Sequence, residues 1–394
     1  MAMETRYIIT NPGSASRKYA FYENDERLIS CHMEREDGKY IATVAVHGKE
    51  YILPVSDESY QESESFFLSL LKKEGLIEEK KEVGIVVFRI VAPGTYFSKT
   101  KKIDDEYLKK LKDYEENVPL HISDIRNEIK TFSRILPHSV LLGVSDSAFH
   151  ASLPEYAKLY AIPKSMSESG IYKYGYHGIS LSFVSKRMGG VFGNVPKKSI
   201  ICHLGSGASV TALKDGKSID TSMGFTPLQG LIMATRSGDI DPGAVFEIMR
   251  EQKKPFYEIE TLLNKQSGLL GISGSSSDIR ELLKEEEKGD ARAALAMKMY
   301  VYRVKKYIGS YIAALQGIDA LIFTATVGER SFIVRERICE GLDSLGIALD
   351  TKKNRAVTKN EERIESFSSL VPVAVISTDE VDEMAREARE FLKL

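Results

Sequence analysis

Short apolar stretches separated by polar turns fill the first part of the chain. They predict β-strands near residues 5–10, 17–23, 27–33, 39–47 and 50–54. Because the turns between them are short, these strands are expected to form an antiparallel meander. Apolar residues at helical spacing then predict helices near 59–74, 104–116 and 123–135.

Two further strands in this part of the chain carry a charge in or beside an apolar run. The run GIVVFRIVAPG at 84–94 holds a single charged residue, Arg89. A lone arginine in an apolar strand is either paired or functional. The strand VLLGV at 140–144 leads to Asp146, which either caps the segment that follows it or belongs to a site.

The second part of the chain is mostly helical outside its glycine-rich stretches. In KYGYHGIS, at 173–180, His177 directly precedes a helix predicted over 179–188. A histidine there either caps the helix or contacts an anion at its N-terminus. A long helix is expected over about 290–315 and should stop at Gly317.

The last third of the chain adds two strands and a terminal helix. Strands are predicted at 318–325 and 371–377, and an amphipathic helix at 378–394. Glu380 follows Ser377 at the spacing of a capping box, so a structural role is one interpretation of this glutamate.

A glycine-containing turn occurs twice at one spacing. Residues 8–24 read IITNPGSASRKYAFYEN and residues 200–216 read IICHLGSGASVTALKDG. Residues 13–14 fall on residues 205–206 at one offset, since 205 − 13 = 192 and 206 − 14 = 192. In each copy a strand enters the turn and a second strand leaves it toward a hairpin turn. The glycines either serve turn geometry or let backbone N–H groups approach a phosphate. The repeat predicts two related halves with a cleft between them.

Composition narrows the class of protein. A chain of 394 residues with 43% hydrophobic residues can form two domains with real cores. Its 54 basic and 56 acidic residues give a formal charge of −2, without long blocks of one sign, so a nucleic-acid partner is not expected. No apolar run approaches the roughly 18 residues of a membrane span, and the start MAMETRYIIT lacks signal-peptide features. Three cysteines without metal-ligand spacing should be buried, reduced thiols.

Longer motifs carry a resemblance to a known family. They are NPGSASRK (11–18), SDSAFH (145–150), YGYHGIS (174–180), HLGSGAS (203–209), DTSMGFTPLQGLIMATRSGDIDPG (220–243), SGLLGISGSSSDIR (267–280) and FTATVGE (323–329). Over nearly its whole length the sequence resembles the acetate kinase (acetokinase) family. The resemblance implies an α/β fold of two duplicated domains of the actin, hexokinase and Hsp70 (ASKHA) type with a central cleft. It divides the chain into 1–148, against which the terminal helix 379–394 packs back, and a nucleotide-binding domain at 149–378.

The same resemblance implies an activity. It is reversible, direct in-line transfer of the ATP γ-phosphate to acetate, giving acetyl phosphate and ADP, with Mg²⁺ or Mn²⁺. A cytoplasmic homodimer is expected, with small-molecule substrates and neither nucleic-acid nor membrane partners. The alternatives are a kinase of propionate, a variant that uses GTP or pyrophosphate as donor, and a catalytically weak relative that binds nucleotide.

The resemblance also assigns residues to roles. The catalytic set is Arg89, Asp146, His177 and Arg236. Two arginines and a donor histidine suit a reaction that needs positioning and charge stabilisation. Since a carboxylate acceptor is already ionised at neutral pH, Asp146 is expected to orient an arginine or a metal-bound water.

Binding residues follow by the same matching. The acid is assigned to Arg89, Val91, Leu120, Tyr176 and Pro227. Nucleotide binding is assigned to Lys18, His203, Leu204, Gly205, Ser206, Gly207, Asp278, Ile279, Arg280, Thr326, Val327, Gly328, Glu329 and Arg330. Magnesium is assigned to Asn11 and Glu380, and secondary contacts to His121 and His150.

Departures from the family pattern fall around the two substrate pockets. FRIVAPG at 88–94 stands where the family has HRVVHGG, and Tyr176 stands where phenylalanine is usual. Thr326 and Arg330 replace a glycine and an asparagine. A β-branched residue at 326 narrows the adenosine subsite unless the loop shifts. Either ATP binds slightly more weakly, or the preferred phosphoryl donor changes.

Overall fold

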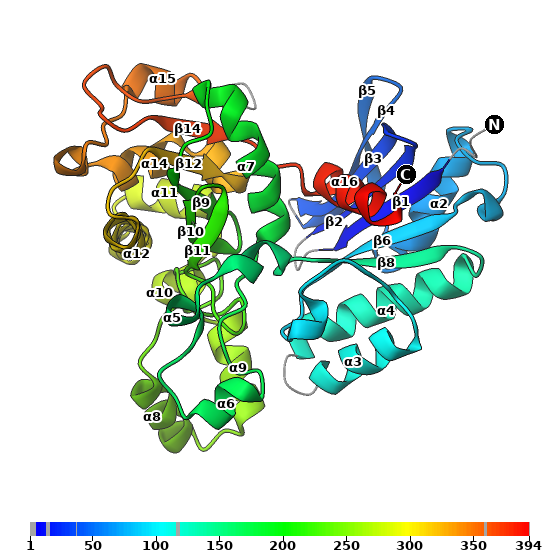
Figure 1. Cartoon of the computed structure of the whole chain (residues 1–394), viewed down its shortest axis with the longest axis horizontal. Helices are drawn as coiled ribbons and strands as arrows, with labels where there is room; N and C mark the ends of the chain where they lie inside the picture. The colour runs from blue at the N-terminus through cyan, green and yellow to red at the C-terminus, as the bar shows by residue number, and fades with distance from the viewer. Residues whose placement is uncertain (1–4, 13–15, 37, 116–118, 358–360, 394) are drawn as a thin grey trace. The chain divides into compact units, whose positions relative to one another are not determined.

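The computed structural model describes residues 5–12, 16–36, 38–115, 119–357 and 361–393. The chain divides into two compact units. Unit 1 consists of Met1–Ala148 together with Asp379–Leu394, and unit 2 is Phe149–Thr378 (Figure 1). Within the described ranges, no helix is long and apolar enough to cross a membrane.

Unit 1 is built on a mixed sheet with the strand order β5-β4-β3-β2-β1-β6-β8-β7. Its strands are β1 (Arg6–Pro12), β2 (Ser16–Glu23), β3 (Glu26–Glu36), β4 (Lys39–Val46), β5 (Lys49–Val55), β6 (Ile85–Ile90), β7 (Lys101–Lys102) and β8 (Val140–Ser145). The first five pair antiparallel in chain order, which confirms the predicted meander. Strand β1 also pairs parallel with β6, and β6 pairs parallel with β8.

Helices cover both faces of this sheet. They are α1 (Asp57–Gln61), α2 (Ser63–Lys73), α3 (Asp105–Glu115), α4 (Pro119–Ile135) and α16 (Glu380–Leu392), with short 3₁₀ turns at Lys80–Glu82 and Thr95–Phe97. One predicted helix over 59–74 is two, because the backbone at Glu62 leaves the helical region. On one face, Phe132 of α4 meets Phe88 of β6 edge-on, with ring centroids 5.7 Å apart. Helix α16 packs against β1, β2, β6 and β8.

The terminal helix is held by its apolar stripe and by polar bonds. Its buried residues Val381, Met384, Ala385 and Ala388 follow the i, i+3, i+4, i+7 spacing of one helix face. Arg389 donates a hydrogen bond to the Tyr7 hydroxyl at 2.9 Å. Residues at the very end of the sequence therefore complete the core of unit 1.

One carboxyl group is buried behind strands β1 and β2. Glu128 of α4 accepts hydrogen bonds from the hydroxyls of Thr10 and Tyr19. Burial raises its pKa to about 8, and the nearby Glu64 carboxylate adds to the rise while Arg17 opposes it. Glu128 is therefore mostly protonated at neutral pH.

Unit 2 repeats the central part of the unit 1 sheet. Its order is β11-β10-β9-β12-β14-β13. The strands are β9 (Lys198–Leu204), β10 (Ala208–Lys214), β11 (Lys217–Thr221), β12 (Ala320–Thr324), β13 (Glu361–Arg363) and β14 (Val373–Ile376). Like β1, strand β9 has an antiparallel neighbour, β10, on one side and a parallel neighbour, β12, on the other.

The offset of 192 residues between the two sequence repeats is also the offset between strands β1 and β9. Adding 192 to the bounds of β1 gives 6 + 192 = 198 and 12 + 192 = 204, which are the bounds of β9. The duplication is thus confirmed. Residues 13–14, the predicted counterpart of 205–206, lie outside the described residues.

The helices of unit 2 pack on both faces of its sheet and extend beyond it. They are α5 (Glu155–Lys158), α6 (Lys164–Glu168), α7 (Gly178–Phe192), α8 (Pro242–Gln252), α9 (Phe256–Lys265), α10 (Gly268–Ser273), α11 (Ile279–Glu287), α12 (Ala291–Leu315), α13 (Ala325–Arg330), α14 (Phe332–Cys339) and α15 (Thr351–Arg355). Short 3₁₀ turns lie at Ala148–Ser152 and Asp343–Leu345. Helix α7 packs on β9, β13 and β14, and α12 on β9 and β10. The long helix begins after the cap Asp290 and ends where Gln316 and Gly317 take positive φ. Cys31, Cys202 and Cys339 are free and buried, as predicted.

Candidate active site

In unit 1, four polar side chains meet at the carboxyl ends of its parallel strands. Arg89 lies on β6, Asp146 directly follows β8, Asn11 lies near the end of β1, and Glu380 is the first residue of α16. The Arg89 guanidinium donates to Asp146 Oδ2 at 3.0 Å and to Asn11 Oδ1 at 3.2 Å. It also donates to Glu380 Oε2 at 3.3 Å. This edge of a parallel sheet is where ligands bind in open α/β folds.

The charges in this cluster stabilise one another. The side chains of Arg89, Asp146 and Glu380 are only 16%, 1% and 12% exposed. Burial lowers the pKa of Arg89, but the carboxylates of Asp146 and Glu380 reverse this and raise that pKa above its ordinary value. Arg89 is therefore a fixed cation, and the lone arginine of the strand is paired.

One structural interpretation from the sequence does not hold. The Asp146 carboxylate accepts a hydrogen bond from Arg89, so this residue belongs to the charged cluster. The N-cap of α16 is Asp379, whose side chain accepts from Asp382 N at 3.1 Å. The capping box from Ser377 to Glu380 is therefore wrong, and Glu380 is turned toward Arg89.

Asn11 and Glu380 were predicted to hold a metal, and their chemistry fits a hydrated magnesium ion. Their side chains are 2.6 Å apart, from Asn11 Nδ2 to Glu380 Oε2. Among the described residues, no group of three or more His, Cys, Asp or Glu side chains could hold a metal ion. A site with only one or two protein oxygens suits Mg²⁺, which keeps several waters and binds substrate phosphates.

In unit 2, the rings of His177 and His203 stack on each other, and His177 lies next to the glycine turn. His177 is the N-cap of α7 in the left-handed region, with φ +62°, and its side chain does not cap the helix. Its Nδ1 lies 2.9 Å from Ser209 Oγ, and its ring stacks on His203 at 3.9 Å between centroids. His203 Nδ1 lies 2.8 Å from Ser180 Oγ. A non-glycine residue in this strained conformation persists only where its surroundings fix it, and such residues cluster at functional sites.

The glycine turn brings His177 and Arg236 together. A Cβ on Gly207 would lie 3.2 Å from His177 Nε2 and 3.5 Å from Arg236 Nη1. Both nitrogens therefore lie close to the backbone of this turn. Arg236 Nη1 also donates to the carbonyl of Pro227 at 3.4 Å.

The long loop that carries Arg236 is held by close backbone approach. Ala234 N donates to Ser206 O at 3.1 Å, which ties the loop to the glycine turn. Gly268 has φ +61°, and a Cβ there would lie 2.3 Å from Met233 O. Only glycine fits at such a position. Within the loop itself the same holds for Gly238, where φ is +69° and a Cβ would lie 2.3 Å from Leu231 O.

His150 contacts the backbone of Tyr176, the residue directly before His177. His150 Nε2 lies 3.0 Å from Tyr176 O, and its Nδ1 lies 2.8 Å from Ser218 Oγ. The Tyr176 hydroxyl donates to Phe225 O at 2.6 Å. The extra hydroxyl therefore has a backbone partner.

The remaining predicted residues fall into both units. Lys18 is exposed on β2, Val91 is half-buried after β6, and the side chains of Leu120 and His121 lie outside the described residues. Leu204 is the last residue of β9, and Gly205, Ser206 and Gly207 form the turn after it, with Gly205 N donating to Gly207 O at 3.0 Å.

Two short helix starts complete the nucleotide set in unit 2. Asp278 caps α11 and pairs with Arg280, their Oδ2 and Nη2 being 2.6 Å apart; Ile279 is the first residue of that helix. On α13, Thr326 and Arg330 are exposed and Val327 is half-buried. Gly205 adjoins this helix, since a Cβ there would lie 3.7 Å from Ala325 Cβ.

Sequence reasoning missed several supporting residues. Ser209 and Ser180 fix the two histidines, and only their places in HLGSGAS and YGYHGIS pointed to them. The carboxylate of Glu329, which the sequence assigns to nucleotide binding, accepts a hydrogen bond from Thr378 N at 3.0 Å. This bond fixes the backbone just before α16.

Two mixed sheets related by duplication, with a glycine turn beside a histidine and an arginine, define a two-domain phosphotransferase of the actin, hexokinase and Hsp70 type. The acetokinase family model matches residues 6–386. The chain belongs to the acetokinase family. It is 41% identical to an acetate kinase of Bacteroides thetaiotaomicron, over 98% of this chain and 100% of the relative.

Solved structures agree in fold. An acetate kinase from Porphyromonas gingivalis matches with a TM-score of 0.84 and 36% identity, covering 98% of this chain and 100% of that one. A propionate kinase from Francisella tularensis matches with a TM-score of 0.87 and 34% identity, covering 97% and 98%. The duplicated α/β fold predicted from the sequence is confirmed.

Proposed function

We propose that this protein is an acetate kinase that transfers the γ-phosphate of ATP to acetate, giving acetyl phosphate and ADP by direct in-line transfer. The observation that carries the proposal is Arg89, a buried guanidinium held by two carboxylates at the carboxyl edge of a parallel sheet. Full-length identity of about 40% to acetate kinases supports the same activity.

The chemistry needs charge stabilisation and positioning more than proton transfer. Acetate is ionised at neutral pH, so no base is required to activate it. Arg89 binds the acetate carboxylate, and Asp146 keeps the guanidinium oriented instead of taking a proton. The Arg236 guanidinium stabilises charge on the phosphoryl group in flight, which is the role of an arginine in this reaction class.

His177 acts as a hydrogen-bond donor. Its Nδ1 lies 2.9 Å from Ser209 Oγ, and its Nε2 lies on the side of Gly207, from which it would donate to a phosphoryl oxygen. Such a donor is most effective when it is preorganised, because no reorganisation is needed at the moment of reaction.

ATP and Mg²⁺ are assigned to the residues that fit them. Magnesium would be held by Asn11 and Glu380, largely through water, and it supplies neutralisation of phosphate charge. The glycine turn at 203–207, the start of α11 at 278–280 and helix α13 bind the nucleotide. Lys18 approaches the donor phosphates.

Acetate is the expected acid, with propionate as the second candidate. The propionate kinase among the structural neighbours keeps the alternative open. GTP or pyrophosphate as donor is a further alternative, which rests on Thr326 and Arg330. A catalytically weak relative is disfavoured, because Arg89, Asp146, His177 and Arg236 are all present and held by specific partners.

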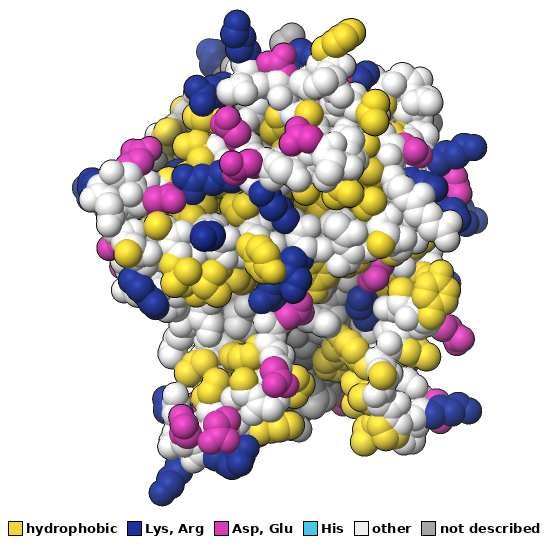
Figure 2. Space-filling model, turned by 90° about the vertical axis from the view of Figure 1, so that its left-hand side faces the viewer, with side chains coloured by type: hydrophobic (Ala, Val, Ile, Leu, Met, Phe, Trp, Pro, Cys, Tyr) yellow, Lys and Arg dark blue, Asp and Glu magenta, His cyan; other side chains and the backbone are white. Residues whose placement is uncertain are grey.

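A homodimer and a cytoplasmic location also remain proposals. Unit 2 exposes large apolar side chains on α12, and Figure 2 shows apolar side chains gathered on one face of the molecule. Those on α12 are Leu295, Met299 and Tyr302. Contiguous apolar patches of this kind mark protein contacts.

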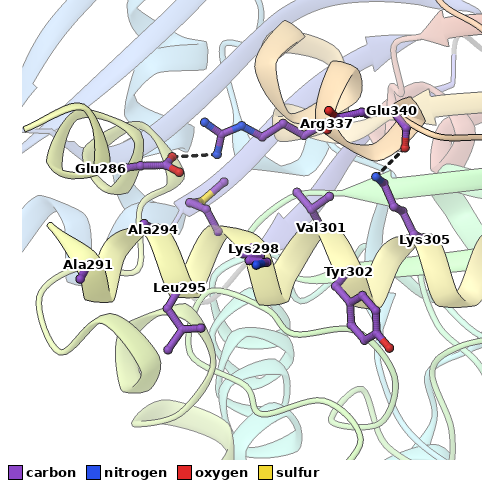
Figure 3. Close-up of a pocket in the computed structure, with 11 residues that line it drawn as sticks. Glu286, Ala291, Ala294, Leu295, Lys298, Val301, Tyr302, Lys305, Arg337 and Glu340 are labelled. Carbon is purple, nitrogen blue, oxygen red and sulfur yellow. Dashed lines mark hydrogen bonds and ion pairs between the residues drawn. The ribbon is translucent and has the colours of Figure 1, made fainter. Parts of the chain in front are cut away.

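A groove of ≈ 600 Å³ runs along α12 on the same unit. Leu295, Val301 and Tyr302 line it, and the ion pair between Arg337 and Glu286 closes one side at 2.7 Å (Figure 3). We propose that a second copy of the chain covers this face. Tyr302→Asp should yield a monomer in sedimentation, whereas a dimer of unchanged stability would exclude the face.

The activity is tested by incubating the purified protein with acetate, ATP and Mg²⁺ and trapping acetyl phosphate as its hydroxamate. Arg89→Met serves as the control for contaminating kinases. Absence of acetyl phosphate above that control would overturn the proposal.

A further inference from the structure

Arg335 on α14 is the largest of the fully buried side chains among the described residues, and it has no role in the proposed chemistry. It is 1% exposed. Its hydrogen bonds in the described structure all go to neutral oxygens of the chain. Burying a guanidinium away from water without a carboxylate is costly, and burial lowers its pKa to about 10. A residue kept at such a cost calls for an explanation beyond packing.

The guanidinium joins the end of α13 to α15. Nη1 donates to Gly328 O at 2.8 Å and to Glu329 O at 2.7 Å. On its other side, Nε donates to Asn354 Oδ1 and Nη2 to Asn354 O, both at 2.7 Å. Asn354 is itself fixed, since its Nδ2 donates to Phe332 O at 3.0 Å.

The two carbonyls on α13 are those that a short helix leaves without partners. The last four C=O groups of a helix lack intrahelical donors, and a cation near them is favourable. Helix α13 spans only Ala325–Arg330 and begins at Ala325 with φ +65°. So short a helix with a strained start has little stability of its own, and the Arg335 fork supplies the missing restraint.

We propose that Arg335 is a positioning residue for the nucleotide, acting by clamping α13 so that its residues 326–328 keep their place beside the glycine turn. This inference rests on the proposed function, because it takes α13 as part of the nucleotide site. A lysine cannot replace the clamp, since one ammonium does not reproduce the planar fork that meets Gly328, Glu329 and Asn354 at once.

Two variants loosen the clamp to different degrees. Arg335→Lys keeps a cation but loses the fork. Asn354→Ala leaves the bonds to α13 and the bond from Nη2 to the backbone carbonyl of residue 354, but it removes the Oδ1 acceptor of Nε and the bond from Nδ2 to Phe332 O. Arg355→Met is the matched control, because Arg355 is adjacent to Asn354 in sequence and exposed. Its guanidinium pairs with Glu336 at 3.8 Å and lies 5.3 Å from the centre of the Phe332 ring, and it makes none of the bonds of the clamp. Loss of such a surface pair changes little.

The steady-state test separates positioning from general destabilisation. We expect Arg335→Lys to raise KM for ATP at least tenfold and Asn354→Ala about threefold, with KM for acetate within twofold of wild type. Should Arg335→Lys fail to fold, Asn354→Ala alone decides. Folded variants whose KM for ATP is unchanged, or whose KM rises equally for both substrates, would overturn the clamp.

Amide hydrogen exchange provides a test that does not depend on turnover. Peptides covering 325–331 should exchange at least tenfold faster in Arg335→Lys and Asn354→Ala than in wild type, and the Arg355→Met control should not. If wild type makes no acetyl phosphate, the proposed function fails while this exchange still decides whether α13 is clamped. Unchanged exchange would overturn the inference even in an active enzyme.

Discussion

Removing Arg89 should lower both the stability and the activity of the protein. A second substitution, at Asp146, should restore the stability but not the activity. In Arg89→Met, the carboxylates of Asp146 and Glu380 lose the guanidinium that bonds both of them. Adding Asp146→Asn removes the more deeply buried charge, while its amide retains hydrogen-bonding capacity.

The magnitude follows from burial. Asp146 is 1% exposed, so leaving it without its cation should cost about 3–5 kcal/mol of folding free energy. The double variant should recover most of this folding free energy. The part that is not recovered is due to Glu380, which is 12% exposed and still lacks its cation. The value of kcat/KM for acetate should fall by about tenfold to a hundredfold in both variants, because the guanidinium proposed to bind the acetate carboxylate is missing from both, and a hydrogen bond to a charged group contributes about 1.5–3 kcal/mol.

Urea unfolding of wild type, both single variants and the double variant gives the coupling free energy of the pair. Acetyl phosphate formation is measured on the same samples. Arg6→Met is the control, since Arg6 also pairs with two carboxylates, Glu23 and Glu82, but the three side chains are 26%, 28% and 27% exposed. Each such partly exposed pair should contribute at most about 1 kcal/mol. Recovery of activity together with stability in the double variant would show that Arg89 is structural and not catalytic.

The remaining predictions concern other parts of the site and one buried acid. Arg236→Ala should fold normally and lose about 10³ to 10⁵ in rate; activity within tenfold of wild type would remove it from the catalytic set. Across acetate, propionate and butyrate, kcat/KM should fall in that order, by about 1–3 kcal/mol for each methylene, and butyrate equal to acetate would contradict the pocket assignment. Thr326→Gly should lower KM for ATP relative to pyrophosphate; the steric argument fails if wild type already prefers ATP widely and the variant leaves its KM unchanged. Because burial raises the pKa of Glu128 to about 8 in the folded state, above its unfolded value, the folded protein should lose stability as pH rises from about 4.5 to 8. The loss is at most about 1.4 kcal/mol per pH unit. Glu128→Gln should flatten this slope, and an equal slope in denaturation series of both proteins would refute it.

Much of the fold could be predicted from local patterns in the sequence. The meander and the offset of 192 residues follow from alternating apolar residues and from turn chemistry, which act over a few positions. The break at Glu62 and the cap at Asp379 were missed because neighbouring residues offer competing caps within two or three positions, and only packing selects one.

Candidate site residues could be named from the sequence where motifs mark them, but their contacts with partners far apart in the sequence could not. Arg89 and Glu380 are separated by 291 positions, and no local pattern announces that pairing. From the sequence alone, Arg335 would be expected at the surface, because arginine is seldom buried. The left-handed backbone of His177 likewise depends on the tertiary contacts that fix it.

Unit 1 is interrupted in the sequence, and this sets the order in which it is completed during translation. Its last central strand, β8, ends at Ser145, and α16 begins at Glu380, which is 380 − 145 = 235 residues later. At roughly 5–20 residues per second, the ribosome needs on the order of 10–50 s to bridge that interval. Until then one face of the nascent sheet lacks its covering helix and Arg89 lacks one of its two carboxylates. Unit 2 is continuous from Phe149 to Thr378, so its synthesis separates the two segments of unit 1, and the N-terminal sheet keeps one face uncovered while unit 2 is being made.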